Sequence, residues 1–493
     1  MSALVWFRDD LRITDHPALT AAAEHGPVTA VYVLDESSTG VRLLGGATRW
    51  WLHHSLTQLQ ASLATLGIPL ILRRGSALDI IPAVVSELGS TGVFWNRRYA
   101  LAEREVDATL KTRLRDSGIE VASFAANLLF EPWTIRTGSG TPYGVFTPFW
   151  KACLAAPLPR QPLAVPAMTA GPSAASDAID DWQLLPTTPD WASGLREMWT
   201  PGEAGARARL EHFLEHGLAD YADGRDFTDR DVTSRLSPHL RFGEISPYQV
   251  WHAASALRST HEKAVSKFLA EVGWREFAWH VLFQFPELAT RNWKPQFDAF
   301  PWREPDPVAL RAWQRGMTGI DLVDAGMREL WHTGTMHNRV RMVVASFLTK
   351  NLQIDWRIGE EWFWDTLVDA DSASNPFSWQ WVAGSGADAA PYFRIFNPEL
   401  QAAKFDPNGA YRERWLGGEL RPAPIVDLKA SRDAALDAYA IVSAEKAANA
   451  RAFDGAQPRA AINQRKPQHF AEPMYCPEIG VSNRLKLRSS KEN

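Results

Sequence analysis

The sequence predicts an α/β domain with a Rossmann-like parallel sheet, followed by a linker and an all-α domain. Short apolar runs alternate with helical patterns through residues 1–130. The helical period dominates residues 201–493, with almost no strand signal. We assign the intervening residues 131–200 to a linker, because the stretch 155–190 is rich in Pro, Ala, Ser and Thr and has no periodicity.

The apolar runs of the first domain have the length of buried strands, and the segments between them have the repeat of amphipathic helices. The predicted strands are 4–7, 30–34, 68–72, 93–95 and 119–123, and the predicted helices are 16–25, 47–66, 77–88 and 101–117. Strands that alternate with helices form parallel sheets with crossover connections. No G-x-G-x-x-G follows the first strand, so the usual dinucleotide fingerprint of this fold is missing.

The composition is that of an ordinary soluble protein, with 45% hydrophobic and 22% charged residues among 493. The net charge of −5 gives no global nucleic-acid signature, so any DNA contact must come from a local basic patch. Cys153 and Cys476 lack metal-ligand spacing and cannot form a disulfide framework. No apolar stretch is long enough to cross a membrane. We expect a cytoplasmic monomer without a metal site.

The segment WFRDDLR follows the first predicted strand. It places Arg8, Asp9, Asp10 and Arg12 at the carboxyl end of that strand, where open α/β sheets bind ligands. The alternative, which we favour, is an Arg–Asp network that closes the domain.

The segment TSRLSPHLRFGEIS contains a predicted helix start, with Ser237 as the N-cap and Pro238 in the first turn. Thr233, Ser234 and Ser237 offer hydroxyls and free backbone N–H groups, with Arg235 between them. Such an arrangement at a helix N-terminus suits a phosphate group. A plain capped helix is the alternative.

Glu271, Trp274 and Arg275 share one side of a predicted helix over residues 263–284. A carboxylate beside an aromatic plane can bind a flipped-out base pair, with one group for hydrogen bonding and the other for stacking. Ordinary core or surface packing is the alternative for an isolated Glu-x-x-Trp.

A polar face is predicted on the helix that begins near residue 336, where Asn338, Arg341 and Met342 lie together with Arg339 on their flank. The opposite, buried face consists of Met336, Val340, Val343, Val344 and Phe347. The polar face can line a pocket, and a solvated surface is the alternative.

Asp369, Asp371 and Asn375 stand on a loop just before the aromatic motif WQW. Carboxylates without neighbouring Cys or His argue only weakly for a metal. They suit hydrogen bonding to a heterocycle, or pairing with a buried arginine such as Arg341.

These motifs together resemble the flavin domain of the photolyase and cryptochrome family. The similar segments are MHNRVRM, DADSASN, WQW and DAAPYFRIFNP, and the resemblance runs from VWFRDDLR to FNPELQAAKFDPNGAYRERW. It implies a bound FAD, an antenna chromophore and light-driven chemistry on DNA. Segments such as FPWREP and GMREL are also similar to plant cryptochromes.

The resemblance assigns roles to individual residues. FAD contacts are expected from Tyr221, Thr233, Ser234, Arg235, Leu236, Ser237, Trp274, Arg275, Asn338, Arg341, Asp369, Asp371 and Asn375. Contacts to DNA or the lesion are expected from Arg225, Glu271, Trp274, Arg275, Asn338, Arg339, Met342, Trp381 and Gln401. The expected catalytic residues are Glu271, Asn338, Met342 and Asn375, and the expected electron-transfer chain is Trp302, Trp356 and Trp379.

The implied activity is that of a cyclobutane pyrimidine dimer photolyase, in which reduced flavin donates an electron to the dimer and later recovers it. Repair of (6-4) products relies on two histidines where this chain has Asn338 and Met342. Asn375 lies near flavin N5 by resemblance, where plant cryptochromes carry Asp, so an amide favours repair. The alternatives are a cryptochrome-type blue-light photoreceptor and a nucleotide-binding module without catalysis. The expected antenna is methenyltetrahydrofolate, ahead of a deazaflavin or a flavin.

Overall fold

The computed structural model describes residues 1–389, 393–418 and 421–455. The chain divides into two compact units, Met1–Glu445 and Lys446–Asn493, and every contact discussed below lies within the first unit. The basic tail predicted over 463–493 and Cys476 lie outside the described residues. Among the residues described, no helix has both the length and the hydropathy of a membrane span.

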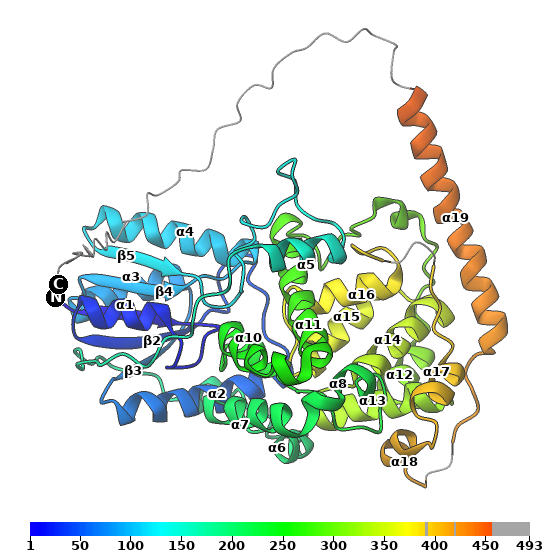
Figure 1. The fold of residues 1–493 in the computed structure, drawn as a ribbon, viewed down its shortest axis with the longest axis horizontal. Helices are drawn as coiled ribbons and strands as arrows, with labels where there is room; N and C mark the ends of the chain where they lie inside the picture. The colour runs from blue at the N-terminus through cyan, green and yellow to red at the C-terminus, as the bar shows by residue number, and fades with distance from the viewer. Residues whose placement is uncertain (390–392, 419–420, 456–493) are drawn as a thin grey trace, which may run out of the picture. The chain divides into compact units, whose positions relative to one another are not determined.

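Five parallel strands form one sheet in the order β3-β2-β1-β4-β5, which confirms the predicted fold of the first domain (Figure 1). The register places Val5 of β1 opposite Ala30 of β2 and Phe94 of β4. The strands are β1 Ala3–Phe7, β2 Val28–Leu34, β3 Leu70–Arg74, β4 Gly92–Asn96 and β5 Glu120–Phe124. β3 therefore begins and ends two residues later than the apolar run 68–72 predicts.

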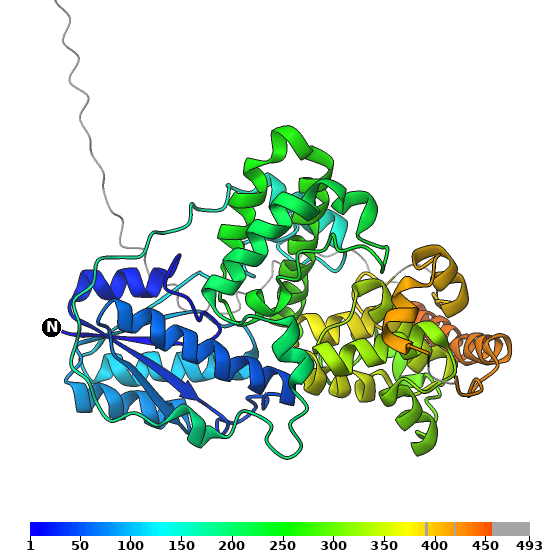
Figure 2. The same cartoon turned by 90° about the horizontal axis from the view of Figure 1, so that it is seen from below.

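Helices cover both faces of this sheet (Figure 2). Along β1, Val5 and Phe7 pack toward α1 and α2, whereas Leu4 and Trp6 pack toward α3 and α4. This alternation follows from the two-residue period of a strand, and both faces are apolar because both are buried. The four helices are α1 Pro17–His25, α2 Gly46–Thr65, α3 Ala77–Leu88 and α4 Leu101–Asp116.

The remaining described elements are helical, as predicted. Residues 156–178 of the predicted linker contain no helix or strand, but α5 precedes them and buries Phe149 in the helical core. The α-helices are α5 Phe146–Ala155, α6 Ser193–Met198, α7 Glu203–His212, α8 Leu218–Gly224, α9 Ser237–Arg241, α10 Pro247–Ala256, α11 Arg258–Gln284, α12 Pro307–Arg315, α13 Asp321–Thr333, α14 Asn338–Ser346, α15 Trp356–Thr366, α16 Ser374–Ala383, α17 Pro398–Phe405, α18 Ala410–Leu416 and α19 Leu428–Gly455. The 3₁₀-helices are η1 Ile179–Trp182 and η3 Pro295–Ala299, and the π-helices are η2 Phe213–Gly217 and η4 Phe347–Asn351.

The arginines and aspartates of WFRDDLR form the internal network that we favoured. Arg8 pairs with Asp107, and the Asp10 carboxylate lies 2.9 Å from His16 Nε2. The fully buried Arg12 donates to the Gly243 carbonyl at 2.8 Å. This last bond ties the carboxyl edge of the sheet to the turn that follows α9.

Candidate active site

The TSRLSP segment begins α9, but its cap differs from the prediction. Leu236 occupies the N-cap position with helical backbone angles, and no side chain caps the helix. The prediction that Ser237 is the N-cap is therefore wrong. Ser237 is the first helical residue and so lies one position after the cap, and its hydroxyl donates to Asp369 Oδ2 at 2.6 Å.

Asp369 links this segment to α14. Arg341 donates to both oxygens of the Asp369 carboxylate, at 3.2 and 3.0 Å, which confirms the predicted pairing. The Arg341 Nε also donates to the Met336 carbonyl at 2.8 Å. Ser237, Asp369 and Arg341 thus form one hydrogen-bonded group drawn from three separate segments.

The residues just before α9 leave hydrogen-bonding groups available. Thr233 and Ser234 are half-buried, and no described residue forms a hydrogen bond with either hydroxyl. Arg235 has a positive φ of 52° and pairs with Asp231 at 2.8 Å. Hydroxyls and backbone N–H groups beside a guanidinium have the donor chemistry that the phosphates of a dinucleotide require. Tyr221 is buried nearby against aromatic side chains, with its ring centroid 5.5 Å from that of Phe268.

Asp371 and Asn375 lie at the start of α16. Asp371 accepts the backbone N–H of Ala373 at 2.8 Å, so its carboxylate caps the positive end of the helix. The Asn375 side-chain nitrogen donates to the Glu360 carbonyl at 3.0 Å and to Glu360 Oε1 at 2.9 Å. Both groups are buried, and neither bond to Glu360 was predictable from the motif.

The polar face of α14 begins with Asn338, because His337 takes the N-cap position and accepts the Arg339 N–H at 3.2 Å. Asn338 is exposed and Met342 is half-buried. On α17, the side-chain oxygen of Gln401 is buried without a hydrogen-bond partner among the described residues. An unpaired acceptor of this kind is available to a ligand.

Glu271 and Trp274 lie on α11, and both already have partners within the chain. Glu271 pairs with Arg225 and also lies 3.2 Å from Lys267 Nζ. The Trp274 ring stacks on Phe146 of α5, with centroids 3.8 Å apart and 10° between the planes. Phe146 therefore covers one face of Trp274.

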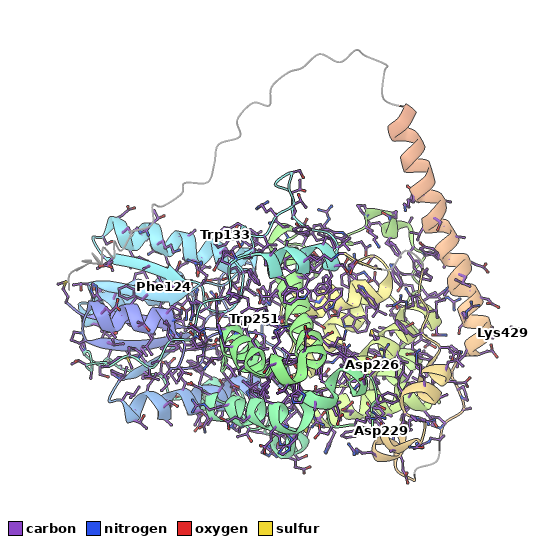
Figure 3. The ribbon with its side chains drawn as sticks, in the orientation of Figure 1. Phe124, Trp133, Asp226, Asp229, Trp251 and Lys429 are labelled. Atoms are coloured by element: carbon purple, nitrogen blue, oxygen red, sulfur yellow. The ribbon has the colours of Figure 1, made fainter. Side chains whose placement is uncertain are left out.

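The three arginines that are expected to contact DNA have partners within the chain. Arg225 pairs with Glu271, and Arg339 lies 2.8 Å from Asp226. Asp226 is labelled in Figure 3. Arg275 is largely buried and donates to the Asn127 carbonyl at 2.8 Å. A DNA contact from Arg275 would require this bond to the Asn127 carbonyl to be exchanged for one to a phosphate.

The predicted tryptophan chain lies on segments that touch one another. Trp379 of α16 is buried against Gly359 of α15, where an added Cβ would approach the ring carbon Cη2 to 2.2 Å. Trp356 begins the same helix, and its indole N–H donates to Asn292 at 2.9 Å. A backbone hydrogen bond of 2.9 Å between Arg303 and Gln353 then holds the segment of Trp302 beside the entry to α15.

Trp381 is the other tryptophan of the WQW motif. Its indole N–H donates to the Asp388 carbonyl at 3.1 Å, and the Arg394 guanidinium lies 5.5 Å from its ring. These contacts place Trp381 beside Asp388 and Arg394 and leave it only partly buried.

Three residues of this region were missed by sequence reasoning. Trp313 of α12 is fully buried with its ring 6.3 Å from that of Trp379. The sequence of this amphipathic helix does not distinguish Trp313 from an ordinary core tryptophan. Glu360 and Arg42, which contact each other at 2.7 Å, are 318 positions apart, so no local pattern connects them.

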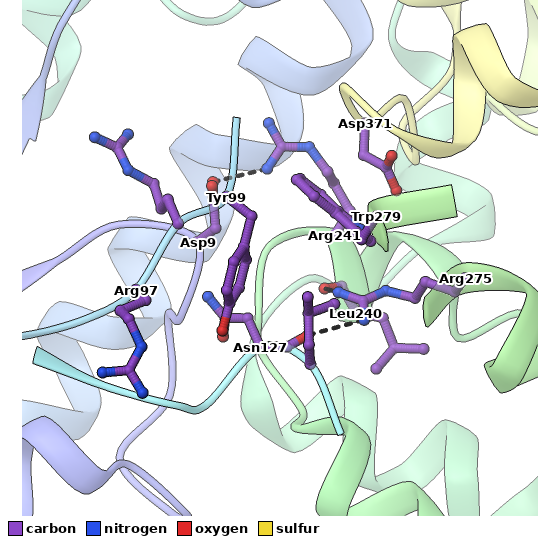
Figure 4. Close-up of a pocket in the computed structure, with 11 residues that line it drawn as sticks. Asp9, Arg97, Tyr99, Asn127, Leu240, Arg241, Arg275, Trp279 and Asp371 are labelled. Carbon is purple, nitrogen blue, oxygen red and sulfur yellow. Dashed lines mark hydrogen bonds and ion pairs between the residues drawn. The ribbon is translucent and has the colours of Figure 1, made fainter. Parts of the chain in front are cut away.

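A small pocket lies between the carboxyl edge of the sheet and the helices (Figure 4). Its cavity is about 20 Å³. Arg241 crosses it to pair with Asp9 at 2.7 Å, and Arg275 reaches Asn127 on another side. The lining residues are Asp9, Arg97, Arg98, Tyr99, Asn127, Leu128, Leu240, Arg241, Arg275, Trp279 and Asp371.

Comparison with known proteins agrees with this arrangement. The family profile for DNA photolyase matches residues 3–167, and that for the FAD binding domain of DNA photolyase matches residues 268–422. A relative from Agrobacterium fabrum, named deoxyribodipyrimidine photo-lyase, is 49% identical over 471 residues, which cover 89% of this chain and 98% of the relative. The chain belongs to the photolyase and cryptochrome family. The prediction of the family and that of a bound FAD are confirmed.

Other members of the family give the same result. The crystal structure of a bacterial class III photolyase from Agrobacterium tumefaciens superposes with a TM-score of 0.86 at 49% identity, and the match covers 90% of this chain and 98% of that one. Cryptochrome-1 of Arabidopsis thaliana is 38% identical over 425 residues, which cover 84% of this chain and 62% of the cryptochrome.

Proposed function

We propose that this chain is a light-driven DNA repair enzyme, a deoxyribodipyrimidine photo-lyase that reverses cyclobutane pyrimidine dimers. The observation that carries the proposal is that one short helix, α16, bears both Asn375 and the buried Trp379. Asp369, in the loop just before α16, accepts a hydrogen bond from Ser237 and so connects the start of α16 to the Ser237 segment. The 49% identity with a relative named for this reaction supports it.

Reduced FAD, when bound, supplies the light absorption and the electron for dimer cleavage. The residues of this chain supply binding and orientation. Thr233 and Ser234 would hold the phosphates through hydroxyls and backbone N–H groups. Asp369, fixed by Ser237 and Arg341, would offer its carboxylate to the cofactor. By family resemblance, Asn375 would contact the flavin ring.

The lesion is held by residues around this helix start. Glu271 hydrogen-bonds the dimer, while Trp274 and Trp381 provide aromatic surface for the flipped-out bases. Asn338 orients a base or flavin edge, and Met342 forms a polarizable wall. Neither of these last two side chains is a general acid, so the pocket suits a reaction without proton delivery and excludes (6-4) repair.

DNA backbone contacts come from Arg225 and Arg339, with a polar contact from Gln401. Each arginine must exchange an acidic partner for a phosphate, because both are ion-paired in the chain. The gain per contact is therefore smaller than for a free cation. Because the net charge of the chain is −5, these contacts must form a local DNA-binding surface.

We also propose an antenna chromophore, methenyltetrahydrofolate ahead of a deazaflavin or a flavin. The pocket of Figure 4 cannot seat it in the present arrangement, because about 20 Å³ holds no more than about one water molecule. The absorption spectrum of the chromophore released from purified protein identifies it.

The divisions 1–130, 131–200 and 201–493 remain our proposal for the domains. A monomeric state and a cytoplasmic location are proposed with them, from composition alone.

A cryptochrome-type photoreceptor is the second candidate, favoured by 38% identity with Cryptochrome-1 of Arabidopsis thaliana. Asn375 argues against it, since plant cryptochromes carry Asp at the position that this residue matches. The two candidates differ in whether light changes the DNA or only the protein.

The test uses purified protein, chemically reduced, with an ultraviolet-irradiated oligonucleotide under blue light and in the dark. We expect dimers to disappear only in the light. Trp379→Phe is the matched variant, because it keeps an aromatic ring but removes the predicted electron donor. It should lose photoreduction of oxidised protein and keep repair by chemically reduced protein. Equal dimer content in light and dark would refute the proposal.

A further inference from the structure

We propose that Arg42, in the loop before α2, is a positioning residue that fixes the orientation of the Asn375 amide through Glu360. The inference rests on the proposed function in one respect, the placement of Asn375 at the flavin. The chain of contacts itself is read directly from the structure.

The two ends of the Asn375 amide have different surroundings. Its nitrogen donates twice, to the Glu360 carbonyl at 3.0 Å and to Glu360 Oε1 at 2.9 Å. No described residue donates a hydrogen bond to its oxygen, Oδ1. The nitrogen is therefore saturated by the protein, and the oxygen is the end left for a ligand.

This orientation is determined by chemistry as well as by geometry. An ionised carboxylate and a backbone carbonyl are acceptors only. A rotated amide would place Oδ1 of Asn375 against two oxygens of Glu360, with no proton between them. The amide can therefore take one orientation only while the Glu360 carbonyl and carboxylate act as acceptors.

Arg42 supplies the counter-charge of the Glu360 carboxylate and holds it in place. The Glu360 side chain is 2% exposed, and an unpaired carboxylate at that depth is strongly unfavourable. Arg42 donates to both of its oxygens, at 2.7 and 2.8 Å, in the bidentate geometry that only arginine supplies.

The loop that carries Arg42 is held against α15 by three further contacts. The Arg42 guanidinium lies 3.9 Å from the Trp364 ring centroid. The Trp364 indole N–H donates to the Leu43 carbonyl at 2.8 Å, and Asp365 accepts the Gly46 N–H at 2.7 Å. The loop also approaches so closely that a Cβ at Gly45 would lie 2.2 Å from the Trp364 carbonyl oxygen.

The consequence is a relay that starts outside the helical region. Arg42 belongs to the connection between β2 and α2, Glu360 to α15 and Asn375 to α16. A residue of the sheet-bearing part of the chain thereby decides which group of Asn375 meets the cofactor. The group presented is an acceptor, which suits a flavin edge that carries a proton.

The experiment is light-minus-dark infrared difference spectroscopy on the full chain with FAD bound and with ¹³C-labelled asparagine. A flavin that contacts Asn375 should produce an asparagine carbonyl band, which Asn375→Ala removes and so assigns. Arg42→Met and Glu360→Met should shift or abolish this band while FAD remains bound. Arg49→Met is the matched control, because Arg49 pairs with Glu36 and makes no contact with this relay. It should leave the band in place.

Two results would overturn the inference. If Arg42→Met and Glu360→Met keep the wild-type band, Arg42 does not position Asn375. If Asn375→Ala keeps the band, Asn375 does not meet the flavin, although light-driven dimer loss in the same sample would leave the proposed function standing. Should Arg42→Met fail to fold by circular dichroism, Arg42→Gln serves in its place, because it removes the charge and keeps a polar side chain at the same position. The same band shift is then expected.

Discussion

Gly359 sets the position of the buried Trp379 ring, and Gly359→Ala should displace it. The added Cβ would lie 2.2 Å from Trp379 Cη2 and 2.5 Å from Cζ3. Carbon atoms in contact are about 3.5–4.0 Å apart, so the ring or the helix must move by more than about 1 Å. The ring cannot retreat freely, since the Phe363 ring lies 4.9 Å away and that of Trp313 lies 6.3 Å away.

The energetic effect follows from two opposing terms. Overpacking a core costs about 1–3 kcal/mol, while alanine in place of glycine favours a helix by about 1 kcal/mol. We therefore expect a net loss of up to about 2 kcal/mol in the free energy of unfolding. The larger effect is on electron transfer, because displacement changes the distance and angle between Trp379 and its neighbours.

The assay follows the loss of visible flavin absorbance under blue light with an external reductant, beside thermal unfolding of the same samples. Gly273→Ala is the matched control, since Gly273 is also helical and its added Cβ would lie 2.5 Å from the ring of Trp150. Both variants should lose stability, and only Gly359→Ala should photoreduce more slowly. Equal photoreduction in the two variants would refute the assignment of Trp379 as the donor.

Two other substitutions test contacts of the site, and a third tests the effect of buried histidines on stability. Ser237→Ala removes the hydrogen bond to Asp369, so FAD affinity should fall about tenfold (~1.5 kcal/mol) in a flavin-fluorescence titration. Arg339→Ala should lower the slope of log Kd for DNA against log salt by about 0.9, and an unchanged slope would mean that Arg339 stays with its acidic partner. Burial lowers the pKa of His280 and His337 to about 4, below the unfolded value of about 6.5. The unfolded chain therefore binds more protons, and the free energy of unfolding should fall as the pH drops from about 6.5 towards 4, by at most about 3 kcal/mol per histidine. His280→Leu should flatten this dependence in an acid series of melting curves.

The sheet was predictable because its three central strands, β1, β2 and β4, are apolar runs buried on both faces. Leu4, Val5 and Trp6 have no exposed side to interrupt the pattern. The start of β3 was placed two residues early because Ile68 is buried without belonging to the strand. The spacing of apolar residues indicates which side chains are buried, whereas the first and last residues of a strand depend on which residues pair with the neighbouring strand.

The site was predictable where a motif carries its own chemistry, as for Asp369 and Arg341. It was not predictable where the partner comes from a distant segment. The Ser237 hydroxyl was expected to cap a helix, but it donates to Asp369, which is 132 positions away in the sequence. Arg225 and Arg339 were expected to contact DNA, and only the fold brings Glu271 and Asp226 against them.

The most direct test of the proposed activity uses two oligonucleotides, one with a single cyclobutane thymine dimer and the other with a single (6-4) product. Each is illuminated with blue light in the presence of reduced, FAD-loaded protein and resolved by chromatography. The proposal predicts restoration of the cyclobutane substrate alone, because Asn338 and Met342 cannot deliver a proton. Restoration of the (6-4) substrate, or of neither, would contradict it.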